Sequence, residues 1–205
     1  TDAHPLDPSF APRADAEGAF SVSRGGYNIS FTLEGADSSP LSRPYAARGA
    51  NTNGDAVEYS DVFENTDLTY KVEQDGVKEA LILESVPEYE DSHWLWHVDA
   101  NALTLSVDEH DVINFTDRYG NVQFHIPTPI MWDSSGTAGE SEPAEQPLST
   151  HVWKDGDGWS LSLSADYNWL KDPARVYPVT IDPGITIGRS DVNAYKSDGA
   201  YRSDG

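Results

Sequence analysis

The chain has 205 residues, and its 35 Asp and Glu against 13 Lys and Arg give a formal net charge of −22. Such a surface repels nucleic acids and anionic lipids, since both bind proteins mainly through Lys and Arg, so we expect no nucleic-acid partner and no membrane insertion. The lack of cysteine excludes a disulfide framework, a zinc ribbon and a cysteine nucleophile. Six Trp, ten Tyr and six Phe are enough large side chains for a substantial core.

The N-terminal part begins with an arm and continues with a hairpin. Residues 1–18 mix Pro, Asp and Ala with little periodicity, which predicts a surface arm. The segment "AFSVSRGGYNISFTLEG" follows and predicts two strands joined at Gly25-Gly26. Residues 34–56 are rich in Ser, Pro, Gly and Asn and are typical of a loop.

The middle of the chain is a series of alternating segments. "DLTYKVEQDGVKEALILES" (67–85) is the clearest hairpin, and Asp75-Gly76 suits the positive φ angles of a type I′ turn. Strands are also predicted over 93–99, 102–108 and 121–127, because apolar residues alternate with polar ones in each of them.

The last third adds another hairpin and a short helix. "HVWKDGDGWSLSLS" (151–164) predicts two strands around a polar turn, and "ADYNWLKDPA" (165–174) predicts one or two helical turns ended by Pro173. Residues 136–149 are acidic and rich in Pro and Gly, so we expect an exposed loop.

The segment "YPVTIDP" (177–183) predicts the closing strand of the fold rather than an active-site loop. Tyr177, Val179 and Ile181 share one face, as in a half-buried strand, and Asp182 is expected not to be catalytic. Pro178 lacks a backbone donor, so the strand is expected to begin there or to lie at a sheet edge. Pro183 is expected to end it.

Together these patterns predict an all-β protein, an antiparallel β-sandwich of roughly ten short strands with little helix. The expected organisation is an N-terminal arm over 1–18 and a sandwich over 19–183, which can comprise two sub-sheets. Residues 184–205 are expected to be a linker or the start of a following domain.

Two groups of residues are candidates for ligand sites. Asp155 and Asp157 resemble the start of an EF-hand calcium loop, but Trp159 falls where an oxygen ligand is needed, so a polar hairpin turn is the simpler interpretation. We therefore expect no cofactor, with calcium at Asp155 and Asp157 as the one alternative. Trp94, Trp153 and Trp159 are candidate glycan-binding residues if exposed, and core residues otherwise. His93 and His97 would lie about 13 Å apart on a strand, too far to share one ion.

Three stretches carry a resemblance to a known family: "YSDVFENTDLTYKVEQDGVKEALIL" (59–83), "DRYGNVQFHIPTPIMWDSSG" (117–136) and "LSLSADYNWLKDPARVYPVTIDP" (161–183). In this order they resemble the N-terminal β-rich region of bacterial RHS/YD-repeat and wall-associated surface proteins, which precedes a DNRLRE-type domain. The resemblance implies an extracellular or cell-wall-associated bacterial module, in some members the N-terminal region of a polymorphic toxin. It transfers no catalytic residue.

Three functional hypotheses follow. The first is a non-catalytic structural or interaction module of a large secreted bacterial surface protein, with adjacent domains of the same polypeptide as partners. The second is a carbohydrate-binding module that recognises a cell-wall polymer or glycan through exposed aromatics. The third is an enzyme such as a glycan hydrolase, for which 35 acidic residues give no specific signal. The first, with no enzymatic activity, is the expectation from sequence.

Overall fold

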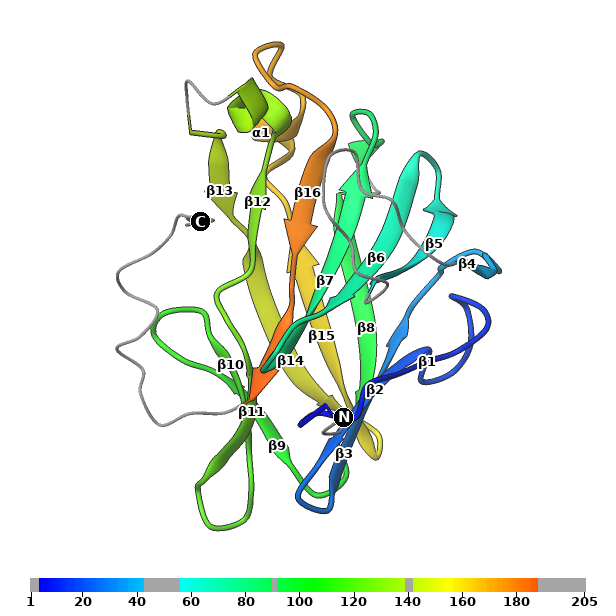
Figure 1. The fold of residues 1–205 in the computed structure, drawn as a ribbon. Coiled ribbons are helices and arrows are strands. Elements are labelled where there is room, and N and C mark those ends of the chain that lie inside the picture. Colours follow the sequence, from blue (N-terminus) through cyan, green and yellow to red (C-terminus); the bar gives the residue numbers. More distant parts are fainter. Residues whose placement is uncertain (1–3, 43–55, 90–91, 139–141, 188–205) are drawn as a thin grey trace.

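A computed structural model of the chain describes residues 4–42, 56–89, 92–138 and 142–187. These residues form two antiparallel sheets that face each other as a sandwich, which confirms the predicted all-β class (Figure 1). The helical elements include the short α-helix α1 (Tyr167–Leu170) and the 3-10 turn η2 (Ser134–Ala138). No helix of the described chain is both long and apolar enough to cross a membrane.

The smaller sheet has six strands in the order β1-β2-β3-β8-β15-β14. Two of its hairpins turn at glycines with positive φ, a conformation that glycine adopts readily. Gly25 and Gly26 have φ of 61° and 87° between β2 and β3, and Gly156 has φ of 57° between β14 and β15. The strands are β1 (Ser9–Phe10), β2 (Phe20–Arg24), β3 (Tyr27–Leu33), β8 (His93–Asp99), β15 (Gly158–Ser164) and β14 (Ser149–Asp155).

The larger sheet has eleven strands, eight of which follow the order β13-β12-β16-β7-β17-β11-β10-β9, while β6, β5 and β4 extend from the other edge of β7. Its strands are β4 (Leu41–Ser42), β5 (Ala56–Phe63), β6 (Thr66–Val72), β7 (Gly76–Leu83), β9 (Thr104–Val107), β10 (Ile113–Thr116), β11 (Val122–Ile126), β12 (Ile130–Trp132), β13 (Glu145–Pro147), β16 (Val179–Asp182) and β17 (Ile185–Ile187).

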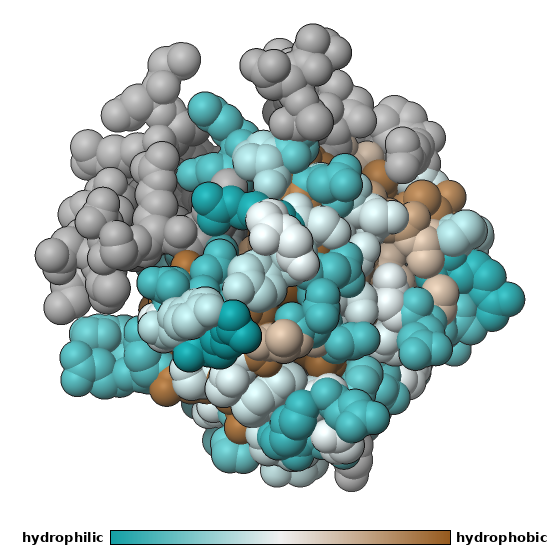
Figure 2. All heavy atoms as spheres, turned by 90° about the horizontal axis from the view of Figure 1, so that it is seen from below, coloured by the Kyte–Doolittle hydropathy of each residue, from teal (hydrophilic) through white to brown (hydrophobic). Residues whose placement is uncertain are grey.

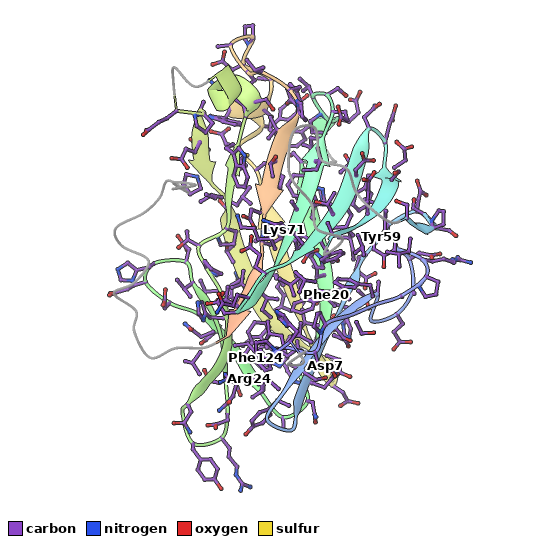
Figure 3. All side chains as sticks on the ribbon, in the orientation of Figure 1. Asp7, Phe20, Arg24, Tyr59, Lys71 and Phe124 are labelled. Atoms are coloured by element: carbon purple, nitrogen blue, oxygen red, sulfur yellow. The ribbon has the colours of Figure 1, made fainter. Side chains whose placement is uncertain are left out.

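The core lies between the sheets and is filled by the inward residue of each alternating pair. Phe20 from the smaller sheet and Phe124 from the larger one both point into this space (Figure 3). Phe31 and Phe115 meet across the sheets with ring centroids 6.2 Å apart. Seen from below, the surface is largely hydrophilic, with hydrophobic side chains in small separate groups (Figure 2).

The segment expected to form the closing strand lies in the interior of the larger sheet. The Tyr177–Pro178 peptide is cis, and β16 begins at Val179, directly after the proline. It is hydrogen-bonded to β7 on one side and β12 on the other, so the first of the two alternatives for Pro178 is confirmed and the edge position is wrong.

Strand β16 ends at Asp182, directly before Pro183 as expected, but the chain then forms a further strand of the same sheet. After Pro183 and Gly184, β17 continues along the same edge of β7, where Ile185 pairs with Val77, and it also pairs with β11 through Phe124 and His125. Paired strands therefore lie outside the range 19–183 that was expected for the sandwich, at both ends. At the other end, β1 pairs with β2 and Leu6 is fully buried.

Two local expectations were wrong. Asp75 and Gly76 do not have positive φ; instead, a Cβ on Gly76 would lie 3.0 Å from the Ile185 carbonyl oxygen, so this glycine allows β17 to approach β7. Within the loop expected over 136–149, residues Glu145–Pro147 form β13, which pairs with β12. Most of the other expected loop, residues 43–55, lies outside the described residues.

Candidate functional site

A buried carboxyl group joins the two sheets. Glu79 on β7 is 4% exposed, and its Oε1 accepts hydrogen bonds from the Tyr70 hydroxyl at 3.2 Å and from Trp96 Nε1 at 3.1 Å. Tyr70 lies on the neighbouring strand β6, whereas Trp96 lies on β8 in the opposite sheet. One oxygen of one side chain therefore links both layers of the sandwich.

Burial raises the pKa of Glu79 to about 8, although the hydrogen bonds from Trp96 and Tyr70 lower it in part. The nearby charge of Asp182 adds to the rise. Burial also raises the pKa of the Tyr70 hydroxyl well above its ordinary value. At neutral pH the site therefore contains a largely protonated acid among uncharged hydrogen-bonding groups.

The sequence analysis did not single out Glu79, although a signal for it was present. Val77, Glu79, Leu81 and Leu83 alternate along β7, and all four are buried. A carboxylate that takes an inward position of an otherwise apolar alternation is the pattern of a buried acid, and such a group needs hydrogen-bond partners.

Tyr70 also connects Glu79 to an aromatic cluster that holds the N-terminal segment. Its ring lies 4.7 Å from that of Phe20 and 5.1 Å from that of Phe10. Tyr59 meets Tyr70 edge-on at 6.3 Å and donates its hydroxyl hydrogen to the Ala11 carbonyl at 2.6 Å. The segment before β2 is thus tied to the same core (Figure 3).

A second polar cluster surrounds Asp133 near α1. Its Oδ1 accepts hydrogen bonds from the backbone N–H groups of Ser135 and Ala144, both at 3.1 Å, and from the Ser135 hydroxyl at 2.5 Å. Its Oδ2 accepts from Val176 N at 3.2 Å and lies 3.3 Å from Arg175 Nη1. Asp133 thus joins three segments that are distant in sequence.

The pKa of Asp133 is lowered. Burial alone would raise it, but the hydrogen bonds from Ser135, Val176 and Ala144 favour the charged form and outweigh burial. The structure therefore holds two buried acids in opposite states, with Glu79 neutral and Asp133 ionised at neutral pH.

The three candidate glycan-binding tryptophans do not form one platform. Trp94 faces the core at 4% exposure, and Trp153 is 38% exposed beside His151 on the outer face. Trp159 is half-buried, with Lys154 Nζ 5.2 Å from its ring centroid. Trp94 also lines a small pocket of about 80 Å³ together with Phe63, Glu64, Asn65, Thr66, Ser85, Val86, Pro87 and Glu88.

The two candidate metal residues belong to the turn between β14 and β15. Asp155 accepts a hydrogen bond from the Ser160 hydroxyl at 3.1 Å, and the Asp157 carbonyl accepts from Lys154 Nζ at 2.7 Å. Across the described residues, no three His, Cys, Asp or Glu side chains come together as a metal site would require. His93 and His97 lie on the face of β8 opposite the buried Trp94 and Trp96.

The three residues expected to have a structural role in the closing segment differ in burial. Val179 and Ile181 are fully buried, whereas Tyr177 is half-buried and donates its hydroxyl hydrogen to the Leu170 carbonyl at 2.9 Å. Asp182 faces the other side of the sheet, where its Oδ2 lies 3.6 Å from Lys78 Nζ. Burial raises the pKa of Asp182, and Lys78 partly counters this.

The two sheets define the chain as an antiparallel β-sandwich with buried polar groups between and beside them. Comparison with known sequences finds relatives of this chain. No family model matches the chain. It is 34% identical over 169 residues to "tRNA nuclease WapA" of Bacillus subtilis strain 168 and equally to "tRNA3(Ser)-specific nuclease WapA" of Bacillus spizizenii, in each case over 80% of this chain and 7% of the relative. It is 37% identical over 141 residues to "tRNA(Glu)-specific nuclease WapA" of Bacillus subtilis subsp. natto, over 68% of this chain and 6% of the relative.

These relatives correct the functional expectations drawn from sequence. Proteins named as tRNA nucleases contradict a non-catalytic structural module, a carbohydrate-binding module and the absence of enzymatic activity. They also replace the broader resemblance to the N-terminal region of RHS/YD-repeat proteins with a likeness to WapA nucleases. The exclusion of nucleic acid was wrong because net charge constrains only the segment's own surface, and this chain spans less than a tenth of each relative.

Proposed function

We propose that the chain is a segment of a bacterial tRNA nuclease of the WapA kind, and that tRNA is the substrate of the whole protein. The observation that carries the proposal is the 34% identity over 169 residues to a protein named tRNA nuclease WapA. Because the chain covers 7% of that relative, the activity is proposed for the complete polypeptide, of which this sandwich is one part.

The substrate is proposed as a class. Two relatives carry names with different specificities, one for tRNA3(Ser) and one for tRNA(Glu), although both match this chain at 34% identity or more. Similarity in this segment therefore does not distinguish one tRNA from another. The protein is further proposed to be located outside the bacterial cell or in its wall, with the adjacent domains of the same polypeptide as direct neighbours of the sandwich.

The test is a cleavage assay with the complete protein that contains this chain. Purified total tRNA and, in parallel, 5S ribosomal RNA are incubated with the protein, and the products are separated on a denaturing gel. The proposal expects defined fragments from one or a few tRNA species and intact ribosomal RNA. Intact tRNA under all buffer and metal conditions, or equal degradation of both RNAs, contradicts it. The 205-residue chain assayed alone shows how much activity this segment carries.

A further inference from the structure

Glu79 is the one side chain in the described core that joins the two sheets through a carboxyl group. Its strand, β7, is also the most connected element of the larger sheet, since β6, β16 and β17 all pair with it. Its partner Trp96 is 1% exposed and lies in the middle of β8, between β3 and β15. The bond from Trp96 to Glu79 thus connects an inner strand of each sheet.

Among the described residues, no cationic side chain contributes to the surroundings of this carboxyl group on the core side. The titratable groups on its side of the sheet are Tyr70 on β6 and Tyr59, behind Tyr70, on β5, while the charge of Asp182 on β16 acts from the other face. Lys78 is the adjacent residue of β7, but its ammonium group lies on the other face of the sheet, against Asp182. A negative charge on Glu79 would have two neutral donors and no opposite charge to offset its removal from water.

We propose that Glu79 is a proton-controlled latch between the two sheets: the protonated carboxyl group accepts hydrogen bonds from Trp96 and Tyr70 without placing a charge in the core, and loss of its proton in alkaline surroundings leaves an uncompensated buried charge that loosens the sandwich. The aromatic cluster extends this effect to the N-terminal segment, because the ring of Tyr70 packs on Phe10 and Phe20. The latch depends on the geometry of the core and not on the proposed nuclease activity.

The direction of the effect follows from proton linkage. The folded-state pKa of about 8 lies above the ordinary value of 4.5, so the folded state binds the proton more tightly than the unfolded state does. The stabilisation is fully present below pH 4.5, falls as the pH rises through about 8, and stays constant above that. The same linkage gives a rise in the unfolding constant on the order of a hundredfold between pH 6 and pH 9.

The experiment compares the 205-residue chain with its Glu79→Gln variant, which retains the shape of the side chain and cannot ionise. Denaturant unfolding and hydrogen exchange of the β7 and β8 amides are measured from pH 6 to pH 9, with exchange corrected for its intrinsic pH dependence. The wild type is expected to lose protection and stability over this interval, on the order of a hundredfold in the unfolding constant relative to Glu79→Gln. Parallel profiles for the two proteins overturn the proposal.

A matched control and a second measurement keep the test decisive. Glu84, just beyond the end of β7, is exposed, so Glu84→Gln removes the same charge from the surface and should leave the wild-type pH profile intact. In the unaltered chain, the indole N–H resonance of Trp96, assigned by its loss in Trp96→Phe, should shift with a midpoint near pH 8. A resonance that does not move between pH 6 and pH 9 overturns the latch even if Glu79→Gln fails to fold.

Discussion

The guanidinium carbon of Arg175 lies 4.5 Å from the centre of the Trp169 ring, and this stacking brings the Arg175 Nη1 within 3.3 Å of Asp133 Oδ2. The Arg175 side chain is 14% exposed and that of Asp133 is 1% exposed, so the pair is largely removed from water. Arg175 lies just before the cis Tyr177–Pro178 peptide that leads into β16. Its ion pair therefore connects the segment after α1 to Asp133 at the end of β12.

Replacement of Arg175 by Met should destabilise the protein by about 2 kcal/mol, because it removes the cation from a buried carboxylate and the cation–π contact with Trp169. Chemical denaturation at pH 7 measures the change. Arg118 provides the matched control, since its guanidinium also stacks on a ring, at 4.6 Å from the centroid of Tyr119, but in an exposed loop. Arg118→Met should cost less than about 0.5 kcal/mol, and equal losses for both variants would contradict the role given to Arg175.

Asp133→Asn should cost about 2–4 kcal/mol at pH 7, because the amide cannot accept all the hydrogen bonds that the carboxylate accepts. The lowered pKa of Asp133 means that its stabilisation is present above the ordinary value of 3.8 and is lost as the pH falls through the folded-state value. The difference in stability between wild type and Asp133→Asn should therefore shrink in strong acid. A difference that stays constant from pH 7 down to pH 2 would show that the charge of Asp133 is not involved.

Chain truncation tests the central position of β16 and β17. A chain ending at residue 187 retains both strands and should unfold cooperatively. One ending at 175 keeps only β6 as the partner of β7 and β13 as the partner of β12, which splits the larger sheet, and it should lose cooperative unfolding. A chain ending at 183 should be intermediate, because it lacks only β17. Thermal unfolding followed by circular dichroism ranks the stabilities of the three proteins. Equal melting curves for the 187 and 175 chains would show that residues 176–187 do not contribute to the fold.

Point substitutions separate the side chains of that segment. Ile181→Asp should prevent folding, since it places an unpaired charge at a fully buried position. Ile181→Val, as the conservative control, should cost about 1 kcal/mol. Tyr177→Phe removes the hydrogen bond to the Leu170 carbonyl and should also cost about 1 kcal/mol. Denaturant unfolding of each variant measures these losses, and a stable Ile181→Asp protein would contradict the burial of this strand.

Gly158 tests the close contact between β15 and β8. A Cβ at this position would lie 2.6 Å from His97 Cε1 and 3.0 Å from the Val98 carbonyl oxygen, so Gly158→Ala should destabilise by about 1–3 kcal/mol. The ring of His97 can move but the backbone of Val98 cannot, so His97→Ala should restore part of the loss. A double-mutant cycle over the two positions gives the coupling, and strict additivity would show that the ring is not the obstacle.

Much of the sandwich could be predicted because its strands keep a strict two-residue period. Trp94, Trp96 and Val98 are buried as their alternation indicated, and the Gly25-Gly26 turn has the φ angles that glycine favours. Strand β5 was missed because its pairing with β6 shifts between Tyr59 and Phe63, where Asp61 takes a positive φ of 52° and breaks the alternation. Strand β17 was missed because Pro183 and Gly184 resemble a stop, and pairing beyond them depends on β7 and β11.

The polar clusters were harder to predict than the strands. Asp133, Ser135 and Arg175 are joined through β12 and the residues that follow α1, and neither local period nor spacing indicates that these parts meet. The proposed tRNA substrate had no local signal either, because a charge of −22 argued against it and the proposal rests on relatives many times longer than the chain.

The course of β16 and β17 along β7 also determines how the domain bears mechanical load. β17 runs antiparallel to β7 and β11 and is hydrogen-bonded to both. A pull on the polypeptide at residue 187, along the strand, would stress these bonds together in shear rather than break them one at a time. The Pro183-Gly184 break separates this short strand from β16, so β17 would yield first and leave Val179–Asp182 in place between β12 and β7.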